Sequence, residues 1–291
     1  MSRSILLKLR IGEILQVTYD HKLYMKTFTD ILLCRICLLA LISGTLILQG
    51  ATERLQVPEN ISNSIRETAM PEMGNSQLEK LLARYYESGL GGSDIWNNIQ
   101  SISLKGSLLL SGNEFEMLCY QRKPNRFKMR LDSGSNRYIL GFDGEDAWQC
   151  LSGDSSSAIK MSPEAARRFI HSAVFGNYLL YPYRVGKKIE YLGTTREMDT
   201  VCHLVRVALD TGYVLDYYID VRTFLDIKIV NYDKELGTSL TLMCEDFRRI
   251  EGFPVAHKII SKSDGGAETL LLINQVKFNL GLTDWIFKRP K

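Results

Sequence analysis

The sequence lacks every short motif that would assign it to a common class of enzyme. It contains no G-x-S-x-G nucleophile elbow, no H-E-x-x-H zinc motif and no phosphate-binding P-loop. Histidine is scarce, with four residues in the chain. Cys202 and His203 could supply two metal ligands, but neighbours in a predicted strand point to opposite faces. We therefore expect no catalytic residue, no metal site and no cofactor, and we do not interpret the protein as an enzyme.

A strong charge of either sign is also missing. Lysine and arginine total 36 against 33 aspartates and glutamates, which gives a formal net charge of +3. This balance provides no electrostatic argument for nucleic-acid binding, which favours a clustered basic face. Internal repeats and low-complexity tracts are absent too. With 291 residues, 45% of them hydrophobic, the chain has the composition of an ordinary globular protein with a large core.

One apolar run stands near the N-terminus. It extends from Ile36 to Leu48 directly after Arg35, which is the pattern of a secretory signal and is short for a full membrane span. Gly50 and Ala51 form a weak cleavage site, because no small residue stands two positions before either of them. Export to the periplasm or the cell envelope is therefore predicted, with either a cleaved signal or an uncleaved anchor.

Composition divides the chain into three regions. Residues 1–50 hold an N-terminal extension and the export segment, and Met25 is a second candidate start. Residues 51–75 are polar, contain two prolines and show no clear period, so they predict a flexible linker. Residues 76–291 carry regular apolar patterns and form the predicted folded domain.

Two helical segments are predicted in this domain. Ser76 and Glu79 form a capping box ahead of apolar residues at helical spacing, and a short further turn carries Trp96. The second segment extends from Ser162 to about Leu180, with Pro163 at its first helical position.

The rest of the domain alternates apolar and polar residues in short runs that are separated by turn sequences such as DSGSN, DTGY and SDGG. This pattern predicts roughly eleven antiparallel strands, and a sheet of that size should curl. The simplest arrangement packs both helical segments on the concave face. DGED, at Asp143 to Asp146, has three carboxylates but is interpreted as one of the turns and not as a metal site.

Six cysteines are present. Cys34 and Cys37 form CRIC inside the apolar N-terminal segment, where a redox motif is not expected. The other four fall in separate predicted strands: Cys119, Cys150, Cys202 and Cys244. They are interpreted as buried free thiols, although disulfides outside the cytoplasm stay possible and the sequence does not give their pairing.

Apolar stripes on the strands supply the candidate ligand-binding residues. Phe127, Met129 and Leu131 share one face of a predicted strand, and Tyr217 belongs to a similar stripe. Most such residues form an ordinary core. A curled sheet of this size, however, has more concave area than two helices cover, so an apolar cavity for lipids or acyl chains is a reasonable consequence.

The segment from Ser162 to Leu180 is predicted to be a mobile lid over that cavity. Phe169 lies on its apolar face, whereas Arg167 and Arg168 should remain in solvent. Carriage of a ligand would require the lid to have open and closed states within a few kcal/mol of each other.

Several segments together resemble one known family. They are LLARYYESGLGGSDIWNNIQSISLKGSL, YQRKPNRFKMRL, GFDGEDAWQ, YYIDVRTFLDIKI and FRRIEGFPVAHKI. In order and spacing, the chain from about Gln77 to Pro290 resembles the outer-membrane lipoprotein-sorting proteins, the periplasmic LolA-like carriers. The resemblance implies a mostly β fold with helices: an unclosed, half-open antiparallel barrel whose helices form a lid over an apolar concave face.

The resemblance also implies roles for individual residues. In the best-known carriers an arginine before Pro-Asn holds the lid by hydrogen bonds to its backbone. Lys123 occupies that position here, so a weaker latch is expected, because lysine lacks the guanidinium fork. Phe127 and Met129 match an aromatic position and a cavity position, and Trp148 matches the tryptophan after the Asp-Gly turn.

These observations favour a monomeric carrier that shields lipoprotein acyl chains or lipids in the envelope. The resemblance implies an inner-membrane donor protein and an outer-membrane acceptor protein as partners. The alternative is a partner-binding sensor on the same fold, like the regulators that bind an anti-sigma factor. Those regulators have a second C-terminal domain, whereas this chain stops at Lys291 after its last predicted strand, and this difference favours the carrier. An enzyme is the third and weakest hypothesis.

Overall fold

The computed structural model describes residues 73–150, 158–171, 173, 175–180, 186–266 and 268–291. The predicted export segment Ile36–Leu48, the cysteines Cys34 and Cys37 and almost all of the predicted linker 51–75 lie outside the described residues. The described part therefore corresponds to the predicted folded domain and the three residues before it.

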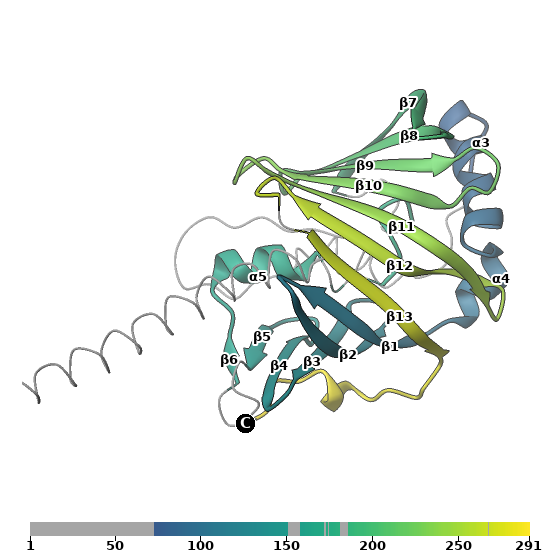
Figure 1. Ribbon diagram of the computed structural model, residues 1–291. Coiled ribbons are helices and arrows are strands. Elements are labelled where there is room, and N and C mark those ends of the chain that lie inside the picture. The colour runs from purple at the N-terminus through teal and green to yellow at the C-terminus, as the bar shows by residue number, and fades with distance from the viewer. Residues whose placement is uncertain (1–72, 151–157, 172, 174, 181–185, 267) are drawn as a thin grey trace, which may run out of the picture.

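One antiparallel sheet of thirteen strands dominates the structure (Figure 1). The strands are β1 Ser101–Leu110, β2 Asn113–Arg122, β3 Arg126–Ser133, β4 Asn136–Phe142, β5 Ala147–Cys150, β6 Ile159–Lys160, β7 Lys187–Glu197, β8 Thr200–Leu209, β9 Tyr213–Asp220, β10 Asp226–Asp233, β11 Thr238–Ile250, β12 Phe253–Ser263 and β13 Glu268–Phe278. Their order is β6-β5-β4-β3-β2-β1-β13-β12-β11-β10-β9-β8-β7, so β6 and β7 form the two edges of the sheet in the described residues. The predicted mostly β, unclosed antiparallel architecture is thus confirmed. The strand count exceeds the expected eleven in part because β6 has two residues, both exposed, and so shows no alternation.

The chain passes from one edge strand of the sheet to the other between β6 and β7. This connection contains helix α5, Pro163–Ile170, which lies inside the curl of the sheet (Figure 1). In the middle of the sheet the first strand pairs with the last, from Ile102 opposite Phe278 to Leu110 opposite Thr269. The sheet therefore curls around α5, with its two halves joined through β1 and β13.

A second group of helices lies across one end of the strands (Figure 1). It consists of α3 Gln77–Arg84, the π-helical turn η1 Tyr85–Gly89 and α4 Gly92–Asn98. The predicted capping box of α3 is confirmed, because Ser76 Oγ accepts from the Glu79 amide while the Glu79 carboxylate accepts from the Ser76 amide. We call α3, η1, α4 and α5 together the inner cover.

Helix α5 is shorter than predicted. It ends at Ile170 instead of about Leu180, and turns follow in the described residues beyond it. Gly176 has a φ of +105°, which is not a helical conformation, and a Cβ there would lie 2.8 Å from the Trp96 ring. The apolar spacing alone could not reveal this change of direction, because the turn residues are themselves buried.

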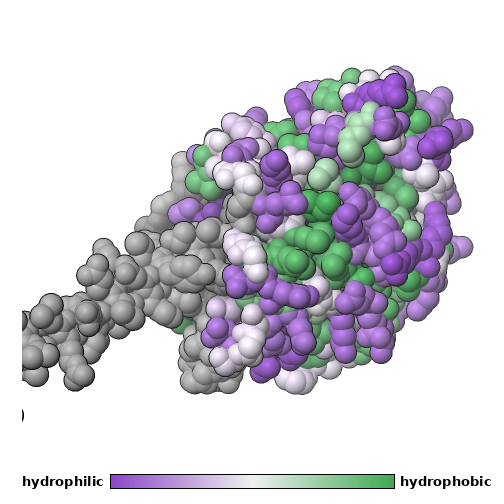
Figure 2. Space-filling model, in the orientation of Figure 1, coloured by the Kyte–Doolittle hydropathy of each residue, from purple (hydrophilic) through white to green (hydrophobic). Residues whose placement is uncertain are grey.

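The two faces of the sheet differ in composition. The concave face and the inner cover share one large cluster of buried apolar side chains. The side of the molecule seen in Figure 2 is largely hydrophilic, with an apolar patch near its centre. Leu109 of β1, Leu270 of β13 and Ile260 of β12 are neighbours in register and are at least partly exposed. The four cysteines of the described strands are all buried free thiols.

Candidate functional site

Five of the predicted ligand-binding residues lie on the concave side of the sheet. Phe127, Met129 and Leu131 project inward from β3, and each is at most 1% exposed. Tyr217 of β9 and Phe169 of α5 belong to the same apolar cluster. The rings of Phe127 and Phe169 meet edge to face with centroids 5.4 Å apart. These five side chains therefore lie in one buried cluster on the concave side, and helix α5 of the inner cover packs directly on it.

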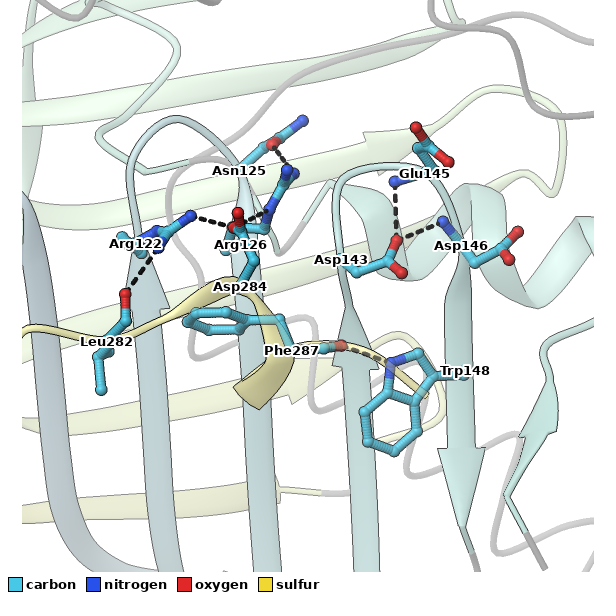
Figure 3. Close-up of polar contacts among 10 residues, drawn as sticks. All are labelled: Arg122, Asn125, Arg126, Asp143, Glu145, Asp146, Trp148, Leu282, Asp284 and Phe287. Atoms are coloured by element: carbon cyan, nitrogen blue, oxygen red, sulfur yellow. Dashed lines mark hydrogen bonds and ion pairs between the residues drawn. The ribbon is translucent and has the colours of Figure 1, made fainter. Parts of the chain in front are cut away.

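Trp148 does not share this face, and the structure corrects its expected place in the lining. It is paired with Gly141 of β4, which is in turn paired with Lys128 of β3, so its side chain lies on the outer face with that of Lys128. A Cβ at Gly141 would lie 2.3 Å from the indole ring, so glycine makes room for the tryptophan. The indole Nε1 donates to the carbonyl of Phe287 at 2.8 Å (Figure 3).

Residues 280–291, which we call the C-terminal strap, cover Trp148 and the outer face of β2–β4. Arg122 Nη1 donates to the Leu282 carbonyl at 2.6 Å and forms an ion pair with Asp284 (Figure 3). The Arg126 Nε lies 3.4 Å from the same Asp284 carboxylate oxygen. Partial burial would raise the pKa of Asp284, but the two arginines outweigh this and hold the pKa below its usual value.

The DGED sequence forms a turn, as predicted. The Asp143 Oδ1 accepts hydrogen bonds from the amides of Glu145 and Asp146, at 3.0 and 2.8 Å (Figure 3). This carboxylate thus stabilises the β4–β5 turn. Across the part of the chain that the structure describes, no group of three or more histidine, cysteine, aspartate or glutamate side chains could hold a metal ion.

Lys123 makes a backbone contact of the kind expected of a latch, but with a different helix. Its Nζ donates to the Trp96 carbonyl of α4 at 2.7 Å and lies 4.3 Å from the centre of the Trp96 ring. Its contact with the predicted lid segment Ser162–Leu180 is with the Phe175 ring, at 5.8 Å. Burial lowers the pKa of Lys123 to about 8. The structure therefore moves the candidate latch from the predicted lid to α4.

Two consecutive tyrosines of η1 also hold the inner cover, and the sequence analysis missed them. The Tyr85 hydroxyl donates to the Asp226 carboxylate of β10 at 2.5 Å, and Asn177 contacts both groups. The Tyr86 hydroxyl donates to the Leu179 carbonyl. Both tyrosines are buried, and both lie in the wide π-helical turn, which has no distinctive sequence pattern.

The Asp226 carboxyl group is strongly perturbed. Burial raises its pKa to about 7, although the hydrogen bonds from Tyr85 and Asn177 oppose the shift. One of its oxygens, Oδ1, is buried and has no hydrogen-bond partner in the described part of the chain. A protonated carboxyl would lower the cost of this burial.

The arginines of α5 are less exposed than predicted. Arg167 and Arg168 have side chains that are 13% and 16% exposed, so the expectation that they remain in solvent is wrong. Arg167 pairs with Asp233 at 2.9 Å, and its guanidinium lies 5.1 Å from the centre of the Tyr213 ring. Because α5 lies inside the curl, both of its flanks meet the sheet, which a helical-wheel argument could not anticipate.

Two basic side chains, His171 and Lys187, form further polar contacts after the end of α5. His171 Nδ1 lies 2.6 Å from the Tyr178 hydroxyl, and burial, with Arg167 nearby, lowers the pKa of His171 to about 3. Lys187 of β7 donates to the carbonyls of Tyr178 and Leu180. Burial lowers the pKa of Lys187 to about 7. The turns after α5 are thus fastened to the β7 edge through main-chain carbonyls.

A groove of about 480 Å³ opens between α3 and the edge formed by β7 and β8. Its walls include Lys80, Leu81 and Arg84 of α3, Tyr191 of β7, His203 of β8 and Phe224 of the β9–β10 turn. None of the residues predicted to bind a ligand lines it. The prediction of a site from apolar stripes could not find it, because half of its wall is the polar flank of a helix.

Searches for relatives give a fold but no sequence family. No protein-family model matches the chain, and no curated protein matches it either. In the described residues, no helix combines the length and hydropathy that crossing a membrane requires.

Solved structures of similar fold exist. The chain is similar to a domain from Vibrio parahaemolyticus that is assigned to an outer membrane lipoprotein-sorting protein, with a TM-score of 0.51 and 12% identity over 78% of this chain and 97% of that one. It is also similar to a LolA superfamily protein from Nitrosomonas europaea, with a TM-score of 0.50 and 14% identity over 73% and 98% of the two chains. At this level of identity the comparison defines the fold, which is LolA-like.

Proposed function

We propose that the protein is an exported envelope carrier or binding protein for the acyl chains of lipids or lipoproteins. The observation that carries this proposal is the continuous apolar face of an unclosed, curled sheet, covered by short helices instead of by a second sheet. A ligand that inserts between cover and sheet meets hydrocarbon on both sides. The LolA-like fold and the apolar run from Ile36 to Leu48 support the same proposal.

The contacts of the inner cover would allow it to move away from the sheet. Discrete polar attachments join it to the sheet: Lys123 holds α4, Tyr85 holds η1, and Arg249 of β11 holds the Ser88 carbonyl. The α5 helix is held in the same way by the ion pair of Arg167 with Asp233 of β10. Each can be broken without breaking the sheet. In the closed state the inward side chains such as Phe127 are buried under the cover, so an acyl chain reaches them only when part of the cover moves.

In this proposal the five inward residues, Phe127, Met129, Leu131, Phe169 and Tyr217, contact the acyl chain after the cover moves. The sorting role extends the proposal: the protein would receive a lipoprotein from an inner-membrane donor and release it to an outer-membrane acceptor. Lys123 would control the step by holding α4 in the closed position.

Photolabelling tests the proposal directly. Protein purified from the envelope is first analysed by native mass spectrometry for a co-purifying lipid. It is then incubated with a diazirine fatty acid, illuminated and mapped by peptide mass spectrometry. We expect labels on inward residues of β3 and on α5, and competition by unlabelled fatty acid.

The outer face provides the internal control for this experiment. Trp148 and the C-terminal strap are also apolar in part, and non-specific labelling would reach them as readily. Labels confined to that face, or the absence of both a bound lipid and any competable label, would overturn the proposal.

A further inference from the structure

The groove beside α3 combines an apolar floor with a cationic rim. Tyr191 and His203 project from the concave side of β7 and β8, with the Tyr191 hydroxyl 3.0 Å from His203 Nδ1. The rings of His203 and Phe224 stack with centroids 5.9 Å apart. These three rings form an aromatic floor at the edge of the sheet, where the groove lies.

Two cations border this floor. Lys80 and Arg84 are four residues apart on α3, so they lie on the same flank of the helix, and both line the groove. Both are exposed, and neither pairs with a carboxylate in the described residues. No aspartate or glutamate is among the lining residues. Within the described residues, the rim therefore presents two positive charges that no carboxylate neutralises.

The groove is continuous with the apolar interior. Leu81 and Phe224 line it, yet both also belong to the buried cluster of the concave face, with exposures of 7% and 8%. A chain that passes between these two side chains reaches the residues under the inner cover. The groove is thus a point where the concave face meets solvent in the described part of the chain, beside a helix of eight residues.

We propose that this groove binds the anionic headgroup of an acyl lipid, with Lys80 and Arg84 pairing the anion and the acyl chain entering between Leu81 and Phe224. The inference rests on the proposed carrier function and specifies its ligand: an amphiphile with a carboxylate or phosphate head. Cations pair with either headgroup through charge-assisted hydrogen bonds, and the aromatic floor suits the first methylene groups.

The experiment compares ligands that share one acyl chain. Isothermal titration calorimetry, below the micelle concentration of each probe, measures binding of lauric acid, lauroyl lysophosphatidylglycerol and neutral monolauroylglycerol. Inorganic phosphate serves as a headgroup without a chain. The proteins are the full chain, the double variant Lys80→Gln with Arg84→Gln, and a control with Lys105→Gln and Lys277→Gln. The control removes the same charge from exposed positions of β1 and β13.

We expect the wild type to bind both anionic probes more tightly than monolauroylglycerol. The groove variant should lose about 5-fold in affinity for the anionic probes, as for a partly exposed ion pair, and should bind the neutral probe unchanged. Added salt should reduce the anionic preference. The control should behave as the wild type. Tighter binding of the phosphate probe or of the carboxylate probe identifies the natural headgroup.

Other outcomes separate the two proposals. The headgroup inference is overturned if the wild type binds neutral and anionic probes with equal affinity and the groove variant has the same affinities. That result leaves the carrier function standing. Failure of all acyl probes overturns both proposals. If inorganic phosphate still binds in that case, the groove is an anion site that is not part of a lipid carrier.

Discussion

The same strands β2–β5 carry two covers that are built in different ways. On the concave face, the inner cover rests on fully buried apolar residues such as Phe127 and is fastened by buried polar groups. On the outer face, the C-terminal strap buries Trp148 and its own Phe287, and it is also fastened by ion pairs of Asp284, whose side chain is 60% exposed. The inner attachment combines a large apolar cluster with buried polar groups, whereas the outer attachment combines two buried rings with ion pairs that are open to water.

The two covers meet at a single turn. Arg122 and Lys123 are consecutive, and they reach opposite faces: Arg122 donates to the strap and Lys123 to the Trp96 carbonyl of α4. Alternation along an extended chain explains this division. It follows that one variant at each position should loosen one cover and leave the other intact.

The largest expected effect is in the inner lining. Phe127→Ala removes a ring that is fully buried against Phe169, so it should lower the free energy of unfolding by about 3–5 kcal/mol. Trp148→Phe keeps most of the outer contact and loses one hydrogen bond, which costs about 1 kcal/mol. Urea unfolding followed by circular dichroism measures both. Equal losses would show that the two faces are not energetically different.

The next effect depends on pH. Asp226 has an ordinary pKa of 3.8 and a folded pKa of about 7, so it folds most favourably as the neutral acid. Its contribution is complete below the unfolded pKa and is lost as pH rises through the folded one. Wild type should therefore lose stability relative to Asp226→Asn between about pH 4 and 7, by at most about 1.4 kcal/mol per pH unit.

Urea unfolding of both proteins across that range gives the comparison. Taking the difference between them cancels His171 and Lys187, whose lowered pKa values affect both proteins alike. A difference that does not change with pH would mean that the Asp226 carboxyl ionises normally, and that the Tyr85 contact is with a carboxylate.

A smaller and more local effect is expected at the shared turn. Lys123→Met removes a buried, charge-assisted hydrogen bond, worth about 1.5–3 kcal/mol. Amide exchange should accelerate in α4 and η1 while the strap stays protected. Arg122→Met is the matched control and should accelerate exchange in residues 282–287 only. Acceleration of both covers by either variant would show that they open together, and Lys123 would lose its assignment as a latch.

The sequence predicted the inner architecture better than the outer one. Alternation placed Phe127, Met129 and Leu131 on one buried face, because a two-residue period is preserved in any strand that packs on a core. It could not assign Trp148 to a face, because all residues of the four-residue strand β5 are buried and its two faces do not differ in exposure. The strap that covers Trp148 lies 139 residues further along the chain, and no local pattern reports such a contact.

Much of the candidate site also depends on distant contacts. Lys123 was expected to hold the segment after β6, but the partner is decided by where α4 crosses the β2–β3 turn. Tyr85 lies at helical spacing from Leu81, but the adjacent Tyr86 does not share that face of an α-helix, and both are buried in the π-helical turn η1. The groove joins a helix flank near Lys80 to strands more than a hundred residues later. Such juxtapositions follow from topology, which composition and spacing do not encode.

The smallest effect is expected at the strap. Asp284→Asn removes the carboxylate shared by Arg122 and Arg126, and exposed pairs contribute up to about 1 kcal/mol. Because the pKa of Asp284 is lowered, the wild-type advantage should be complete at neutral pH and should vanish as pH falls below the ordinary aspartate range. This pH dependence of stability is opposite in sign to that expected for Asp226.

Exchange of the Phe287 amide, which donates to the Asp284 carbonyl at 3.1 Å, reports local release of the strap. Glu145→Gln, at the nearby exposed turn, is the control and should change neither property. If Asp284→Asn destabilised the protein as much as Phe127→Ala, the outer cover would be part of the core, and the contrast between the two faces would fail.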